Sequence, residues 1–302
     1  MTELKNISAN SPVRSEAVCI VVTAYNPHPD SLRDNLLSYA HQGGKIVVCD
    51  NSDNVSIQGI VEAMAAEFEN AVYLPMGGNI GIAAAQNRGV DYAIEHGYEY
   101  FIEIDQDSSL PQGYVDNIAQ SYARLVQDGE QVAGIGPIAV RADGFVYDGH
   151  GKTTQVVVVD KTLSSGFFFS RKAYEAVGPK DEALFIDYVD WEWCWRARDR
   201  GMKVYVDPGS AITHMLGNGH RKVLGFQVGL PAPIRHYYQY RNGFYMLKRG
   251  YVPLSWRAKR LVIMLAKMPL YAFWVGEGQA RRKYIWKALS DVIAGKDGKL
   301  SW

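Results

Sequence analysis

Two aspartates stand one residue apart at the end of an apolar strand. The segment from Tyr100 to Ser108 reads YFIEIDQDS and ends in Asp105 and Asp107. Side chains alternate between the two faces of a strand, so the carboxylates share a direction if the backbone stays extended. Mg²⁺ and Mn²⁺ take oxygen ligands, often one or two carboxylates plus substrate phosphates. The pair is therefore a candidate seat for a metal-bound diphosphate, and a polar turn capping the next helix is the structural alternative.

Two earlier strands also end in polar residues. The apolar run 17–24 breaks at Tyr25-Asn26-Pro27, and the run 45–49 is followed by Asp50-Asn51-Ser52. Strand, polar loop and helix repeat along this half of the chain, which predicts an α/β fold with a parallel sheet covered by helices. Ligands bind beyond the carboxyl ends of such strands. We therefore expect the three polar clusters to meet at one edge of the sheet.

Each cluster offers groups that suit a nucleotide. Asp50 can accept a hydrogen bond from the N3–H of uracil or thymine, and Thr23 and Asn26 offer a hydroxyl and an amide to base or ribose. The glycine-rich segment 77–81 lacks the Lys-Ser/Thr of a phosphate-binding P-loop. We interpret it as a loop laid against a nucleotide, with Asn87 and Arg88 along the following helix. Arg88 either neutralises phosphate or is solvated.

A second acidic cluster comprises Asp187, Asp190 and Glu192 among aromatic residues. Asp190 can cap a helix that runs to Arg200 and stops at Gly201. A capping role explains one acidic residue, but it does not require three of them among several aromatic side chains. Carboxylates next to apolar surface acquire raised pKa values and suit general-base work, so Asp190 is also a candidate base.

Small residues and a histidine complete the candidates. Ser165 and Gly166 precede three phenylalanines, and small side chains allow a ligand to approach the backbone. His214 follows a strand predicted at 202–206. A lone histidine is usually structural or solvated, but His214 falls at the edge of the sheet where we expect the metal site.

Composition indicates a globular intracellular protein of 302 residues, long enough for one large domain with an extension or for two domains. The three cysteines are an odd number and read as buried apolar residues, not as a disulfide framework. The polar segment 1–16 has no apolar run, so we expect no signal peptide.

The segment 235–302 differs from the body of the chain. It carries 14 Lys and Arg against 3 Asp and Glu, whereas the preceding part has 18 against 29. We expect a basic, aromatic, helical extension that walls the acceptor site, lies on an anionic membrane or mediates dimerisation. Its apolar runs are too short to span a bilayer, and its aliphatic content favours lipid over nucleic acid.

The ordered set 23–26, 50–52, 78–81, 105–107, 185–196 and 212–214 resembles family 2 glycosyltransferases of the GT-A fold, and among them the bacterial rhamnosyltransferases. The resemblance covers about residues 18 to 250. After the polar tail at 1–16, it implies a GT-A domain at 17–234, with a mostly parallel sheet flanked by helices. The helical extension at 235–302 follows. The resemblance also implies an inverting transfer from a nucleotide sugar, usually dTDP-β-L-rhamnose in rhamnosyltransferases.

The resemblance assigns roles residue by residue. Asp190 is the base that deprotonates the acceptor hydroxyl, and Asp107 and His214 are expected to bind Mg²⁺ or Mn²⁺. The expected donor-binding residues are Thr23, Tyr25, Asn26, Asp50, Asn51, Asn79, Asn87, Arg88, Asp105 and Gln106. The expected acceptor-binding residues are Ser165, Gly166, Trp191, Glu192 and Arg241.

We expect the acceptor to be a bacterial cell-surface glycan or a polyprenyl-diphosphate-linked precursor. The expected location is the cytoplasm or the inner face of the cell membrane. Two alternatives stay open, namely a nucleotide-sugar or glycan binding module without turnover, and the same transfer from a UDP-sugar.

Overall fold

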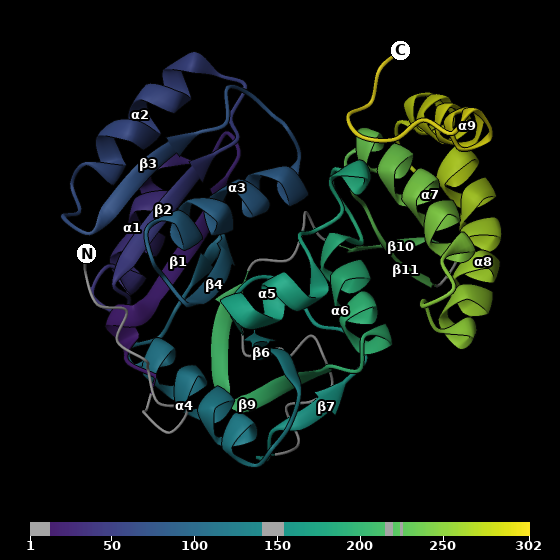
Figure 1. Cartoon of the computed structure of the whole chain (residues 1–302). Helices are drawn as coiled ribbons and strands as arrows, with labels where there is room; N and C mark the ends of the chain where they lie inside the picture. Colours follow the sequence, from purple (N-terminus) through teal and green to yellow (C-terminus); the bar gives the residue numbers. More distant parts are fainter. Residues whose placement is uncertain (1–12, 141–153, 215–219, 224–225) are drawn as a thin grey trace.

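A mixed β-sheet runs through the molecule, and helices cover both of its faces (Figure 1). The computed structural model describes residues 13–140, 154–214, 220–223 and 226–302, and the side chains of 214–229 are not described. Most of the predicted polar tail, residues 1–12, lies outside the described part. The strands of the main sheet are β1 (Val18–Ala24), β2 (Lys45–Asp50), β3 (Ala71–Pro75), β4 (Tyr100–Asp105), β5 (Ser108–Ser109), β6 (Val132–Val140), β7 (Val157–Val159), β8 (Phe167–Ser170) and β9 (Lys203–His214).

The strand order is β3-β2-β1-β4-β8-β6-β9-β5, and β7 pairs with β9. The half formed by β3, β2, β1 and β4 is parallel, as the sequence predicts. The other half is mixed, because β8 runs antiparallel between β4 and β6, whereas β6 and β9 pair in parallel. Strand β9 reaches His214, well past the strand predicted at 202–206. A separate hairpin comprises β10 (His220–Val223) and β11 (Phe226–Gly229).

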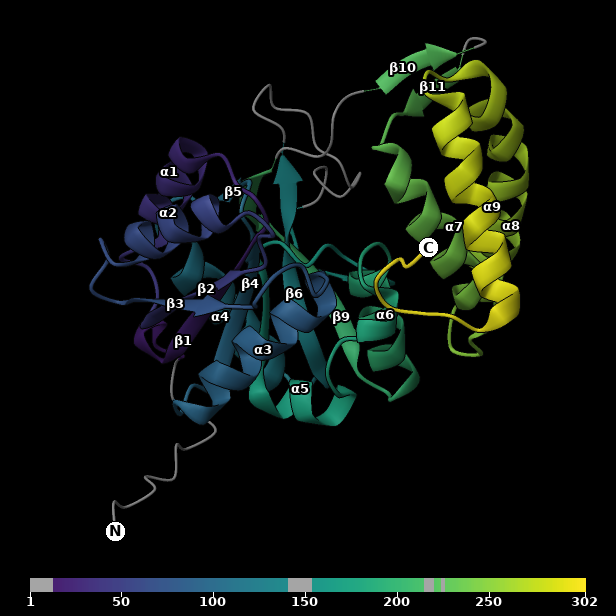
Figure 2. The same ribbon diagram turned by 90° about the horizontal axis from the view of Figure 1, so that it is seen from above.

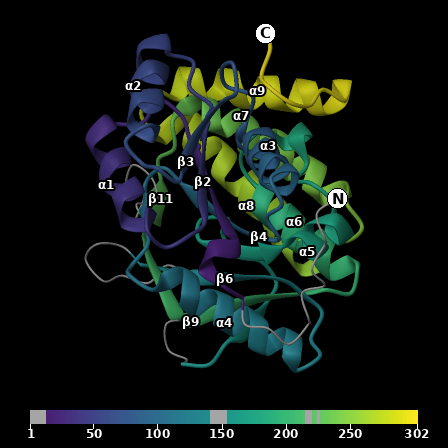
Figure 3. The same ribbon diagram turned by 60° about the vertical axis from the view of Figure 1, so that its left-hand side comes forward.

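The helices divide between the two faces. Helices α1 (Pro29–Tyr39), α2 (Val55–Ala65) and α4 (Tyr114–Gln127) pack on one face, where alternate residues of β1 such as Ile20 and Val22 point. Helices α3 (Ile82–Glu95), α5 (Arg171–Val177) and α6 (Val189–Asp199) pack on the other, with Val21 and Phe101. Figure 3 shows α1 and α2 on one side of the sheet and α3, α5 and α6 on the other. Burial on both faces explains the continuous apolar runs of these strands.

The end of the chain forms a helical unit beside α6 (Figure 2). It comprises α7 (Pro233–Lys248), α8 (Leu254–Pro269), a π-helical turn (Leu270–Trp274) and α9 (Gly278–Ala294). Its own core includes Tyr237, Tyr240 and Met264, and it reaches the body of the protein through Phe185. The helical extension is thus present, and α7 begins two residues before the predicted start at 235. Among the residues described here, no helix has the length and apolarity needed to cross a membrane.

Candidate active site

The carboxyl ends of β1, β2 and β4 bring the first predicted cluster together. In the sheet register Thr23 lies opposite Asp105, and Ala24 lies opposite Asp50. Gln106 then ties two of these loops, because its amide oxygen accepts from the Tyr25 N–H at 2.5 Å and its amide nitrogen donates to the Tyr25 carbonyl at 3.3 Å. The hydroxyl of Thr23 is buried and has no hydrogen-bond partner among the described residues. An orphaned hydroxyl at this edge fits a ligand-binding rim.

Asp50 lies beneath this rim and not on its surface. Its side chain is 1% exposed, and its carboxylate accepts from the Ser52 N–H at 3.0 Å and the Tyr73 hydroxyl at 3.0 Å. The Ser52 hydroxyl in turn accepts from the N–H of Asn26, which has φ of 42°. In this structure the Asp50 carboxylate holds the loop through these hydrogen bonds, and its contact with a base stays a prediction.

A ring of polar contacts joins the loop after β2 to the glycine-rich loop. Asn51 accepts from the Ile80 N–H at 2.7 Å and donates to the Asn79 amide oxygen at 3.2 Å. Asp53 accepts from the Asn79 N–H at 2.9 Å and from the Tyr25 hydroxyl at 3.2 Å. The Asn79 N–H, with Lys299 and Tyr25, holds the pKa of Asp53 below its ordinary value. No role was predicted for Asp53. It lies in a run of turn-forming residues, and the sequence does not show which of them connects the two loops.

Asn87 and Arg88 lie on α3, away from this ring. Asn87 is buried, donates to the Lys180 carbonyl and to Glu182, and accepts from the Lys180 N–H, each at 2.9 Å. Both ends of its amide are thus used inside the protein, and its predicted contact with the donor stays a prediction. Arg88 is exposed.

The glycine-rich loop also abuts the segment that leads to Asp190. Gly81 has φ of +93°, and a Cβ there would come within 2.7 Å of the Phe185 ring. The N–H of Ile82 donates to the Phe185 carbonyl at 2.8 Å. Only glycine permits this close approach. The glycine-rich loop is therefore in direct contact with the segment before Asp190.

Asp190 lies in the first turn of α6. Tyr188, in the left-handed conformation, takes the N-cap position, so the predicted capping role of Asp190 is wrong. The half-buried carboxylate lines a small cavity together with Thr162, Leu163, Ser164, Phe167, Lys180, Trp193 and Cys194. Burial raises the pKa of Asp190 to about 6, and the nearby Asp105 charge adds to that rise, whereas the Trp191 N–H and Lys180 oppose it. This carboxylate is suited to take a proton near neutral pH.

Lys180 pairs with Glu103 below this cavity, and both side chains are buried. The ammonium group also donates to Gln86 at 2.9 Å. Burial raises the pKa of Glu103, and Lys180 opposes that rise. The pair was not predicted from the sequence, although an acid inside an apolar strand indicates a buried partner.

The loop before α6 holds an unusual backbone. Phe185, Asp187 and Tyr188 all have positive φ, between 64° and 69°. Non-glycine residues adopt that region at a cost of about 1 to 3 kcal/mol each, and it persists only where surrounding contacts fix it. Strain of this kind clusters at functional sites.

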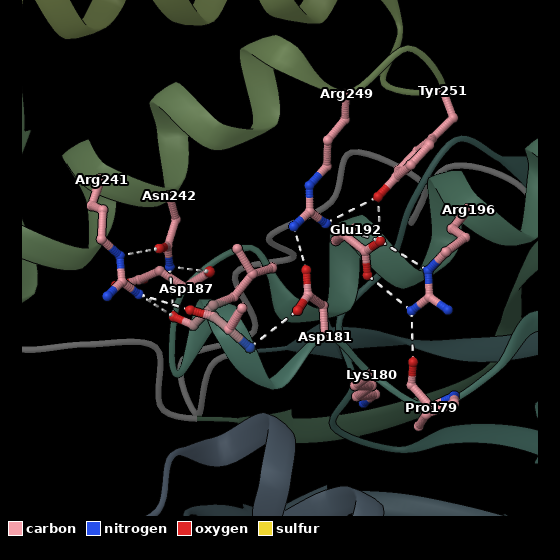
Figure 4. Close-up of polar contacts among 12 residues, drawn as sticks. Pro179, Lys180, Asp181, Asp187, Glu192, Arg196, Arg241, Asn242, Arg249 and Tyr251 are labelled. Atoms are coloured by element: carbon pink, nitrogen blue, oxygen red, sulfur yellow. Dashed lines mark hydrogen bonds and ion pairs between the residues drawn. The ribbon is translucent and has the colours of Figure 1, made fainter. Parts of the chain in front are cut away.

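Side chains of α7 fix this loop (Figure 4). The amide nitrogen of Asn242 donates to the carbonyls of Leu184, Ile186 and Asp187 at 2.7, 2.8 and 3.3 Å. Arg241 donates to the carbonyls of Ala183 and Leu184, both at 3.1 Å. Arg241 is fully buried and does not face the surface here, so its predicted contact with the acceptor stays a prediction. It positions the loop that carries the candidate base.

Glu192 belongs to a second group of contacts in Figure 4. It is 1% exposed and pairs with Arg196 at 2.9 Å and with Arg249 at 3.1 Å, and it accepts from the Tyr251 hydroxyl at 2.5 Å. Arg249 also contacts Asp181. These interactions occupy the carboxylate, so the predicted contact between Glu192 and an acceptor is not supported. Glu192 joins α6 to the end of α7.

Ser165 and Gly166 support the end of β4. The Ser165 hydroxyl accepts from the Asp105 N–H at 3.2 Å and donates to the Ser108 hydroxyl at 2.8 Å, and Ser165 is 1% exposed. Gly166 is packed against Tyr114 and Pro137. Both residues are close to the site but lie under it. Trp191 is partly exposed beside Asp190, with the Lys161 ammonium 4.3 Å from its ring centre, and remains available to an acceptor.

The predicted metal residues meet at the β5–β9 pairing. His214 lies opposite Ser108 in the register, one residue from Asp107. Its side chain is outside the described part, and the described residues contain no cluster of three His, Cys, Asp or Glu able to hold a metal. Asp105 and Asp107 are half-buried at the strand end. One or two carboxylates completed by substrate phosphates is the usual arrangement for Mg²⁺, so this donor set fits the ion.

Comparison with known proteins identifies the family of this chain. The family model described as "Glycosyl transferase family 2" matches residues 19–175. The chain is 31% identical over 259 residues to dTDP-rhamnosyl transferase RfbF of Shigella flexneri, which covers 81% of this chain and 84% of that protein. The chain belongs to glycosyl transferase family 2. The predicted resemblance is confirmed, and the protein is an inverting-type glycosyltransferase.

Solved structures of glycosyltransferases confirm the GT-A fold. S. aureus TarS (residues 1–349), in complex with UDP-GlcNAc, superposes with a TM-score of 0.56 at 17% identity, covering 91% of this chain and 80% of that one. GalNAc-T7 with UDP, GalNAc and Mn²⁺ gives a TM-score of 0.55 at 12% identity, covering 92% of this chain. The present chain spans 58% of the GalNAc-T7 chain.

Proposed function

We propose that this protein transfers L-rhamnose from dTDP-β-L-rhamnose to a hydroxyl of a bacterial glycan or lipid-linked precursor, with inversion to an α-L-rhamnoside. The relationship to a dTDP-rhamnosyl transferase supports the donor. The observation that carries the chemistry is Asp190, a carboxylate that lines a small cavity and whose pKa is raised by burial and by the charge of Asp105.

In this mechanism Asp190 takes the proton of the acceptor hydroxyl as the oxygen attacks the anomeric carbon. Its raised pKa leaves it ionised at neutral pH yet basic enough to accept a proton. The strained loop before α6 is held by the hydrogen bonds from Asn242, which we call the Asn242 clamp. These contacts keep Asp190 at its position, so the loop need not rearrange when the substrates bind. No covalent intermediate with the protein is needed.

Asp107, with Asp105 and His214 beside it, would hold Mg²⁺ or Mn²⁺. Such an ion, when bound, offsets the negative charge of the nucleotide diphosphate. The Tyr25, Asn51 and Asn79 loops would bind the nucleoside, with Tyr25 44% exposed at the rim. Trp191 would contact the acceptor next to the base.

A thermal-shift panel of dTDP, UDP and GDP with Mn²⁺ tests the donor class. We expect the largest rise in melting temperature with dTDP, because a ligand that binds the native state stabilises it in proportion to its affinity. A larger response to UDP would favour the UDP-sugar alternative. Binding without any release of dTDP from dTDP-rhamnose, in the presence or absence of glycan acceptors, would favour a binding module.

We also propose that the helical unit attaches the enzyme to an anionic membrane. Val262, Leu265, Phe273, Trp274 and Trp286 are each more than half exposed on α8, the π-helical turn and α9. Basic residues such as Lys267, Arg282 and Lys283 interleave with them, a composition that suits the membrane interface. Sedimentation with phosphatidylglycerol vesicles at low salt tests this. Protein that stays in the supernatant as a dimer would favour a subunit interface instead.

A further inference from the structure

Arg235 links the start of α7 to the loop that carries the candidate base. Its Nε donates to Asp187 Oδ2 at 3.1 Å, and its Nη2 donates to Oδ1 at 2.5 Å. This paired geometry is the one in which a guanidinium binds a carboxylate or a phosphate. Asp187 is one of the residues with positive φ, so the ion pair sits on the strained part of the loop.

Two further carboxylates interact electrostatically with the Arg235 guanidinium. Asp105 and Asp190 both interact with it electrostatically, so Arg235 lies among acids from the end of β4, the loop and α6. Its side chain is 44% exposed, whereas that of Asp187 is 13% exposed. A ligand entering the site can therefore reach Arg235 while Asp187 stays covered.

A cation at this place suits a nucleotide diphosphate. The diphosphate brings at least two negative charges to a rim that already holds Asp105, Asp107 and Asp190, so a positively charged side chain that reaches it favours its binding. Lys180 is buried and paired with Glu103, so it is not available to the ligand. Arginine suits the remaining task because its fork of N–H groups matches phosphate oxygens.

We propose that Arg235 is a further catalytic residue, which binds the diphosphate of the donor and stabilises it as the leaving group. The inference rests on the proposed function. In the transfer step the acceptor oxygen forms a bond to the anomeric carbon, and the bond from that carbon to the diphosphate oxygen breaks. The electron pair of the broken bond stays on the diphosphate, beside Arg235, and the acceptor proton moves to Asp190. Asp187 holds the guanidinium in place until the donor arrives.

The test compares binding of dTDP and thymidine to three variants by calorimetry with Mn²⁺ at low ionic strength. Arg235→Met should weaken dTDP binding about 10-fold to 100-fold, the usual range for losing a charged hydrogen-bonding partner. Thymidine binding should not change, because that ligand has no phosphate. Arg235→Lys should lie between Arg235→Met and wild type, since it keeps the charge and loses the fork.

Asp187→Asn is the matched control, because it breaks the same ion pair from the other side. If Arg235 served only to hold the loop, Asp187→Asn would lose as much dTDP affinity as Arg235→Met, and that result would overturn the inference. Equal dTDP affinity of Arg235→Met and wild type would also overturn it while leaving the proposed function intact. A wild-type protein that binds neither dTDP nor UDP would remove both.

Discussion

Replacing Asp190 by asparagine should raise the free energy of unfolding at pH 7 and at the same time lower the rate of transfer. The folded protein raises the pKa of this carboxyl from an ordinary 3.8 to about 6. Since one unit corresponds to about 1.4 kcal/mol, the ionised form costs the folded state at most about 3 kcal/mol at pH 7. Partial exposure of the side chain lowers this figure, so about 2 kcal/mol is a working value. Asparagine carries no charge and keeps an oxygen to accept from the Trp191 N–H at 2.9 Å.

The sign of the pH dependence follows from the direction of the shift. Between pH 4 and pH 6 the folded protein holds the Asp190 proton more tightly than the unfolded chain does, so this group makes stability fall as pH rises. Asp190→Asn lacks that dependence. Its stability advantage over wild type should be small at pH 4 and should grow to about 2 kcal/mol at pH 7, roughly 4 °C in melting temperature for a protein of this size.

The assay pairs thermal unfolding at pH 4 and pH 7 with transfer from dTDP-rhamnose. Transfer should fall by about 10²-fold to 10⁴-fold in Asp190→Asn, the usual contribution of a general base. Wild-type transfer should decline as pH drops below about 6, because the base is then protonated. Asp199→Asn is the control, since Asp199 is an exposed acid at the end of the same helix.

Two results would refute this reasoning. Near-normal transfer by Asp190→Asn would remove Asp190 from the role of base. A stability difference from wild type that does not change between pH 4 and pH 7 would mean that the carboxylate is not in the desolvated position described.

Three other outcomes are expected. Asn242→Ala removes the donor to three loop carbonyls and should cost about 2 to 4 kcal/mol in urea unfolding, with transfer reduced more than dTDP binding; unchanged transfer would contradict the clamp. Lys180→Met leaves the Glu103 carboxylate buried without its cation and should cost about 3 to 5 kcal/mol, most of which Glu103→Gln should restore in the double variant. EDTA should abolish transfer and added Mn²⁺ or Mg²⁺ should restore it, whereas full activity in the chelator would count against Asp107 as a ligand.

The parallel half of the sheet was predictable from the sequence because its strands are buried on both faces. Continuous apolar runs, each followed by a polar loop, signalled β1, β2 and β4 and the edge at which Thr23 meets Asp105. The antiparallel insertion of β8 between β4 and β6 was not predictable, since pairing between distant strands leaves no local pattern. Helix α7 belongs to the helical extension that the sequence predicts, although its aromatic residues have little helix propensity and tertiary packing stabilises it.

The sequence indicates which residues are candidates for the site, but it says less about the role of each one. Residue type identified Asp190 as an acid in an apolar setting, and the structure gives it the raised pKa expected there. Type alone could not distinguish side chains that face a ligand from those that support the backbone beneath it. Arg241, Glu192 and Asn87 have the chemistry of binding residues, yet burial assigns their hydrogen bonds to neighbouring loops.

The contacts after α9 bear on how this enzyme can be shortened or fused. The N–H of Gly298 donates to the Ala183 carbonyl at 2.8 Å, and the Lys299 ammonium reaches the Asn79 carbonyl at 3.0 Å. Residues after α9 thus contact both the glycine-rich loop and the loop before α6, and Arg241 donates to the Gly298 carbonyl at 2.6 Å. A fragment cut near residue 234 would keep every described strand and still lose the contacts that position the loop before Asp190, the candidate base. A tag fused directly after Trp302, or a deletion from about residue 295 onward, is expected to disturb these contacts.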